Sequence, residues 1–84
     1  MEEMKQVSGG VWRTVNTGVS GMKAAIRLEA RKSSKQISSV SNGTSVDTVT
    51  DQLVYDPESG RNFVQVNVNG KTGWIAASII GMPR

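Results

Sequence analysis

Residues 67–75 read N-V-N-G-K-T-G-W-I, and the Asn69-Gly70 pair within them predicts a tight β-hairpin. A two-residue turn that matches the twist of its strands needs positive φ at both central positions, which asparagine and glycine adopt most easily. The six residues before the turn alternate between valines and other side chains, as a strand with one buried face does. After the turn, Gly73 allows close backbone approach, and we expect Trp74 to be a buried or half-buried core residue.

The composition excludes much enzyme chemistry. The chain of 84 residues is long enough for one small domain and contains no cysteine and no histidine. It therefore has no disulfide framework, no thiolate or imidazole metal site and no Ser-His-Asp or Cys-His nucleophile. Its few carboxylates are scattered in turns rather than paired for acid–base work. We expect a protein that is not an enzyme and that needs no cofactor or metal.

Positive charge is concentrated in one stretch. The formal net charge is +3, and residues 23–35 hold five basic side chains with one acid, Glu29. The five are Lys23, Arg27, Arg31, Lys32 and Lys35. Such a patch can meet phosphates, an acidic wall polymer or an acidic protein. The simpler interpretation is a solvated strand face and loop.

The sequence also suggests a location. No apolar run approaches the roughly 18 residues of a membrane span, and the first ten residues contain no apolar signal-peptide core. We expect no membrane insertion. As written, the chain is expected in the cytoplasm, whereas a piece of a longer secreted protein would belong to the cell wall or the extracellular space.

Residues 22–36 fit two patterns. As a helix, Met22, Ile26 and Ala30 share one face at i, i+4 spacing, and the composition suits a helix. As a strand, Ile26, Leu28 and Ala30 point inward and the charged residues between them point outward. Stacked basic residues would repel one another in the helix by roughly a few tenths of a kcal/mol per pair, which slightly favours the strand.

Other short β-rich runs follow one another along the chain. Residues 1–20 are expected to form an N-terminal extension with one candidate strand, in which Trp12 is a packing anchor. Further candidate strands are residues 36–40, 44–50 and 53–55, separated by turns at residues 42–43 and 56–60. A tight turn is expected at residues 76–78. Five to seven short strands at a spacing near ten residues predict an all-β barrel or sandwich.

Several of these motifs resemble the bacterial SH3 (SH3b) domains. Residues 28–31, L-E-A-R, look like that family's L-N-[VA]-R motif, and residues 69–75 match N-G-K-x-G-W-[VI] almost residue for residue. The resemblance covers about residues 22–81. It implies that residues 21–84 form a small, strongly bent SH3-like β-barrel of antiparallel strands without catalytic activity, and that residues 22–36 are strand.

The resemblance also implies a binding role. In bacterial wall hydrolases such domains bind peptidoglycan or its peptide cross-bridges, and elsewhere they bind peptides or proteins. This chain departs from the family in the ligand groove: the loop after Arg31 is about three residues short, Phe63 replaces a tryptophan, and Ile79 replaces a tyrosine. Stacking on aromatic walls contributes roughly 0.5–1.5 kcal/mol per contact, so these changes weaken the family's peptide-binding mode.

The candidate ligand-binding residues are Arg31, Lys32, Lys35, Tyr55, Phe63 and Trp74. Tyr55, in a polar loop, is the best candidate for an aromatic that faces a ligand; alternatively it covers one end of the barrel. Arg31 can bind a ligand carboxylate or fasten the loop by donating to backbone carbonyls, and we favour the second role because carbonyls are exposed at a strand end.

Three functions follow from these observations. The leading hypothesis is a non-enzymatic binding module of the bacterial SH3 type, which recognises a bacterial cell-wall peptide or an extended protein segment. The alternative is a cytosolic or phage-encoded interaction subunit that docks a protein partner or self-associates through a strand edge. Nucleic-acid binding through residues 23–35 is disfavoured, because that stretch interleaves no aromatic side chains with its basic ones.

Overall fold

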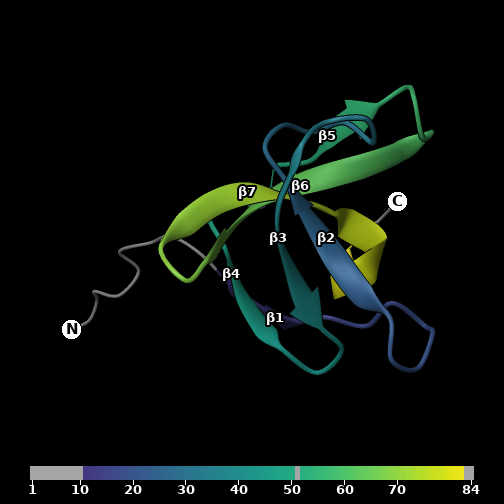
Figure 1. Ribbon diagram of the computed structural model, residues 1–84. Coiled ribbons are helices and arrows are strands. Elements are labelled where there is room, and N and C mark those ends of the chain that lie inside the picture. Colours follow the sequence, from purple (N-terminus) through teal and green to yellow (C-terminus); the bar gives the residue numbers. More distant parts are fainter. Residues whose placement is uncertain (1–10, 51, 83–84) are drawn as a thin grey trace.

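A computed structural model describes residues 11–50 and 52–82 (Figure 1). Over these residues the chain forms seven short strands, all paired antiparallel, and one turn of 3-10 helix. The elements are β1 (Val11–Thr14), β2 (Lys23–Arg27), β3 (Gln36–Ser41), β4 (Ser45–Thr48), β5 (Val54–Asp56), β6 (Arg61–Val68), β7 (Lys71–Ala76) and η2 (Ala77–Ile80). The predicted all-β fold is confirmed, and the tight turn predicted at residues 76–78 is the start of η2.

The strands form one sheet in the order β1-β4-β6-β7-β2-β3, with β5 also paired to β6. β6 is the longest strand: it pairs with β7 from Phe63 to Val68, with β5 near its start and with β4 near its end. Figure 1 shows that the strands curl round one interior instead of lying in a plane. Within the described residues, no helix is long and apolar enough to cross a membrane.

The predicted hairpin joins β6 to β7. Asn69 has φ of 52° and Gly70 has φ of 80°, so both central residues adopt the left-handed conformation that this turn requires. The register pairs Val64 with Ile75 and Val66 with Gly73, and these residues face the interior. The valines of β6 are buried as the alternation predicts, and they form the centre of the core.

Gly73 is the point of closest approach between β7 and β2. A Cβ placed on Gly73 would lie 2.5 Å from Cγ2 of Ile26 and 2.9 Å from the backbone oxygen of Arg27. Only a residue without a side chain lets the two strands meet at this distance. Their backbones pair at Arg27 and Trp74, the residue that follows Gly73.

The strand predicted through Leu28 and Ala30 ends earlier. β2 stops at Arg27, the β2–β3 register shifts next to it, and Leu28 is 53% exposed instead of buried. The physical reason is that the Leu28 N–H donates to the oxygen of Lys35, which closes residues 28–35 into a loop that leaves the sheet. Only the part of the stretch up to Arg27 alternates as predicted.

The predicted packing role of Trp12 is wrong. The predicted extension, residues 1–20, is described from Val11 onwards, and its strand β1 pairs with β4. In that register Trp12 lies opposite Asp47 and is 67% exposed, whereas Val15, just beyond the strand, is buried in the core. β1 is a terminal strand of the described sheet, and the side chain of Trp12 lies on an exposed part of its surface.

Replacing Gly73 tests the close approach of β7 to β2. We expect Gly73→Ala to lower the free energy of unfolding by about 1–3 kcal/mol, because the new methyl group meets a backbone oxygen that cannot rotate away. Gly73→Val should lower the free energy of unfolding further, since its larger side chain meets the same atoms of Ile26 and Arg27. Urea unfolding measures both, and equal stability of the two variants and the parent would contradict the packing described.

Candidate functional site

A cavity of about 360 Å³ opens on the outer face of the sheet, where β2, β6 and β7 lie together. Its floor contains Phe63 of β6, Ala76 of β7 and Ala25 of β2. Phe63 pairs with Ala76 and points away from the valine core, yet only 5% of it is exposed. Two alanines beside a large ring leave a hollow, because their methyl groups do not reach the height of the neighbouring side chains. We call this hollow the outer-face pocket.

The wall of the outer-face pocket carries three basic side chains and one acid. Arg27, Lys32 and Arg61 line it together with Glu58. Nη1 of Arg27 donates to the backbone oxygen of Ser34 at 3.0 Å. Nη2 of Arg61 donates to Oγ of Ser78 at 2.9 Å. A guanidinium has five N–H donors, so each arginine is held in place by one bond and keeps others for a ligand.

Asp56 joins the two loops that form this wall. Its Oδ2 accepts the backbone N–H of Lys32 at 2.9 Å and the hydroxyl of Ser59 at 2.8 Å. Its Oδ1 accepts the backbone N–H of Glu58 at 3.0 Å. The side chain is fully buried between the loop at residues 28–35 and the β5–β6 turn. One carboxylate thus positions three residues that line the pocket, Lys32, Glu58 and Ser59.

Burial and hydrogen bonding oppose each other in setting the pKa of Asp56. Desolvation by burial raises the pKa, but the hydroxyl of Ser59 and the backbone N–H groups of Lys32, Glu58 and Ser59 stabilise the ionised form. The hydrogen bonds outweigh the burial, and the pKa lies below its usual value. Asp56 is therefore an ionised structural anchor at neutral pH.

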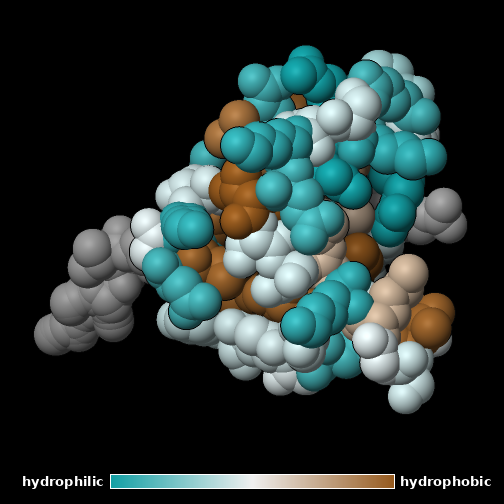
Figure 2. Space-filling model, in the orientation of Figure 1, coloured by the Kyte–Doolittle hydropathy of each residue, from teal (hydrophilic) through white to brown (hydrophobic). Residues whose placement is uncertain are grey.

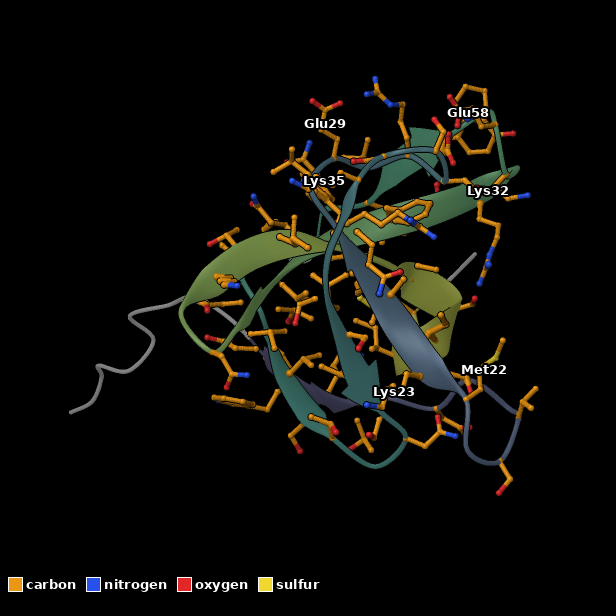
Figure 3. All side chains as sticks on the ribbon, in the orientation of Figure 1. Met22, Lys23, Glu29, Lys32, Lys35 and Glu58 are labelled. Carbon is orange, nitrogen blue, oxygen red and sulfur yellow. The ribbon has the colours of Figure 1, made fainter. Side chains whose placement is uncertain are left out.

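A second contact closes the wall between the same loops. Oε1 of Glu58 accepts the backbone N–H of Ser33 at 3.1 Å, so this carboxylate is also tied to the 28–35 loop. Figure 3 shows Lys32 and Glu58 at the same end of the molecule, and both line the outer-face pocket. In Figure 2 this end is covered mainly by hydrophilic side chains.

Comparison with known protein families identifies most of this fold. Residues 23–80 match the bacterial SH3 domain, a segment that holds β2 to η2 and every residue that lines the outer-face pocket. The chain belongs to the bacterial SH3 domain family. No match is found among curated proteins or among solved structures. Bacterial SH3 domains are generally non-catalytic binding modules, so the family supports a general role in binding.

In this bacterial SH3 domain, two of the six predicted ligand residues meet at the outer-face pocket. Lys32 and Phe63 line it, as does Ile79, the residue that stands where the family usually has tyrosine. The other predicted residues do not line the pocket: Arg31, Lys35, Tyr55 and Trp74. Trp74 is half-buried on the same outer face, between Gln65 and Arg27 of the neighbouring strands.

Tyr55 lies on a different face. It pairs with Asn62, the neighbour of Phe63 in β6, and successive residues of a strand point to opposite sides. Tyr55 is 62% exposed, on the side of the β5–β6 hairpin away from the outer-face pocket. It does not cover the barrel end tightly, and it lies on the opposite side of the hairpin from Phe63.

The loop-fastening role predicted for Arg31 belongs to Arg27. Arg31 forms an ion pair with Glu29 and its side chain is about half exposed. Among the described residues, the arginine that donates to a backbone carbonyl of this loop is Arg27, through Ser34. The structure differs from the prediction because β2 ends at Arg27, beside the loop, whereas Arg31 lies within the loop and pairs with Glu29.

The sequence did not reveal most of the residues that line the outer-face pocket, nor the role of Asp56 in holding them. Ala25, Arg27 and Arg61 come together only through the pairing of β2, β6 and β7, which no local pattern reveals. Asp56 could have been found, because aspartate at the first position of a D-P-E-S-G turn accepts the N–H two residues later. The basic stretch at residues 23–35 is not one patch: Figure 3 shows Lys23 far from Lys32 and Lys35.

Acid should loosen the pocket wall through Asp56. Because its pKa is lower in the folded protein than in the unfolded chain, its stabilising effect is present above about pH 4 and is lost as the pH falls through the folded value. We expect Asp56→Asn to be less stable than the parent at pH 7. Both carboxylate oxygens of Asp56 accept backbone N–H groups, whereas the side-chain N–H₂ of asparagine is a donor and cannot accept one of these hydrogen bonds. The difference between the two proteins should shrink below pH 4.

Urea unfolding at pH 7, 5 and 3 measures this difference. The two proteins differ only at this carboxylate, so the comparison isolates Asp56. A constant difference across the three pH values would contradict the role assigned to its ionised form.

Proposed function

We propose that this domain is a non-enzymatic module that binds an extended peptide at the outer-face pocket, and that the peptide belongs to the bacterial cell wall. The observation that carries the proposal is the hollow over Ala25, Ala76 and Phe63, which opens outward while the core remains closed beneath it. Its volume lies near the lower end of the range of about 300–1,000 Å³ for ligand pockets. It has room for one or two peptide residues.

The surface next to the pocket supports an extended ligand. Trp74 lies on the same face, two residues from Ala76 along β7 and diagonally across from Phe63. An extended chain advances about 3.3 Å per residue, so a peptide that starts in the pocket reaches the ring of Trp74 within two or three residues. Half of a tryptophan ring offers a stacking surface that adds roughly 0.5–1.5 kcal/mol. The ring thus partly replaces the groove aromatics that the chain lacks.

The chemistry of the pocket supports binding over catalysis. Its lining contains one carboxylate, Glu58, which already accepts a backbone N–H. The nearby Asp56 accepts several hydrogen bonds, and its lowered pKa does not suit a group that must exchange a proton near neutral pH in general acid–base catalysis. Among the described residues, no group of three or more acidic side chains could hold a metal ion.

Retention on purified peptidoglycan sacculi tests the proposal. We expect the domain to sediment with sacculi in low-salt buffer and Ala25→Leu to lose most of that retention, because the longer side chain fills the hollow from its outer side. Ser45→Leu is the matched control, since it adds the same side chain at an exposed position of β4. Failure of the parent protein to sediment would contradict a wall ligand, and equal retention of both variants would contradict the pocket as its site.

A second candidate function is self-association through β1. Two neighbouring side chains of this terminal strand are largely exposed, Trp12 at 67% and Val11 at 54%. Apolar side chains on a strand with one unpaired edge favour pairing with a second chain. This candidate does not use the outer-face pocket, so the two functions can be tested separately.

Light scattering tests the second candidate. We expect a dimer to dissociate when Trp12→Ser removes the exposed ring, while Thr14→Ser on the same strand leaves the mass unchanged. A monomer for the parent protein at about 100 μM would exclude self-association.

A further inference from the structure

The wall of the outer-face pocket has more positive than negative charge. The pocket is lined by three cations, Arg27, Lys32 and Arg61, and one carboxylate, Glu58. The ionised Asp56, which is bonded to the Lys32 N–H, offsets a second charge, so one positive charge remains in excess. Within residues 11–50 and 52–82, no ion pair joins Glu58 to any of the three. The carboxylate instead accepts the N–H of Ser33. An anionic group would balance this wall better than any neutral ligand.

The two arginines are positioned before a ligand arrives. Arg27 is held from the 28–35 loop by Ser34, and Arg61 is held from η2 by Ser78. Both side chains are only partly exposed, so charge interactions at the pocket are less screened than on an open surface. Binding then costs little side-chain entropy, because each guanidinium already occupies a fixed position.

The floor of the pocket is apolar, so it favours a different part of a ligand from the charged wall. Ala25, Ala76, Phe63 and Ile79 present a small apolar surface at the bottom of the cavity. A short apolar side chain can bury itself there without displacing the arginines. The pocket therefore offers an apolar contact and an anion contact within one or two residues of each other.

We propose that the outer-face pocket binds the C-terminal carboxylate of a peptide whose last residue is small and apolar, such as alanine. In a terminal residue the carboxylate and the side chain leave the same Cα, so one residue can meet the arginines and the alanine floor together. An aspartate or glutamate side chain provides the carboxylate without a separate apolar group beside it. The inference rests on the proposed function and names the part of the peptide that enters the pocket.

Isothermal titration calorimetry with three short peptides tests the inference. The first is N-acetyl-trialanine with a free C-terminus, the second is the same peptide as its carboxamide, and the third is a carboxamide that ends in aspartate. Hydrogen bonds to charged groups contribute about 1.5–3 kcal/mol, so the free acid should bind at least about tenfold more tightly than either amide. Its affinity should fall as salt is raised.

Lys32→Gln and Lys71→Gln form a matched pair of variants. The side chain of Lys32 lines the pocket but only its backbone N–H supports the fold, so the substitution leaves the structure intact. Lys71 is exposed at the β6–β7 turn, at the opposite end of β6 from Arg61. Lys32→Gln should weaken binding of the free acid several-fold more than binding of the trialanine carboxamide, and Lys71→Gln should leave all three affinities unchanged.

Each outcome separates this inference from the function it rests on. Equal affinity for the free acid and its carboxamide would overturn the carboxylate site while leaving peptide binding intact. Tighter binding of the peptide that ends in aspartate would overturn the terminal assignment in favour of a side-chain carboxylate. If no peptide binds but sacculi still retain the protein, the inference fails and the proposed function stands. If neither binds, both fail.

Discussion

The close backbone contact at Gly73 is the constraint on which the rest of the structure depends. Because no side chain stands between β7 and β2, the two strands can pair, and the sheet closes over the core of valines and isoleucines. The same contact places the outer sides of β2 and β7 next to each other. Ala25 and Ala76 can share a pocket only because their strands meet at Gly73.

The buried carboxylate of Asp56 positions the loops that form the wall of the outer-face pocket, the proposed binding site. The 28–35 loop and the β5–β6 turn come from distant parts of the sequence, and Asp56 draws them together through backbone N–H groups of both. These bonds hold Lys32, Glu58 and Ser59 in position beside Phe63, and all four residues line the outer-face pocket. The valine face of the sheet forms the core, and the proposed binding site lies on the opposite face.

The sequence predicted what local chemistry decides. The Asn69-Gly70 turn, the all-β fold and the bacterial SH3 family were all recognised, because each depends on residues close together in the chain. The residues that line the outer-face pocket were predicted less well. Lys32 and Phe63 line it and stand at groove positions of the family, but Arg27 and Arg61 reach it through long-range strand pairing. Large aromatic side chains do not reveal their own burial, and Trp12 was misplaced for that reason.

Backbone amide chemical shifts, recorded during titration with solubilised peptidoglycan peptides, test most directly whether ligand binds the outer-face pocket. We expect the largest shifts on the residues that surround the pocket, those of β2, the 28–35 loop, the β5–β6 turn and the junction of β7 with η2. Shifts centred on β1, or on the side of the β5–β6 hairpin that carries Tyr55, would contradict it.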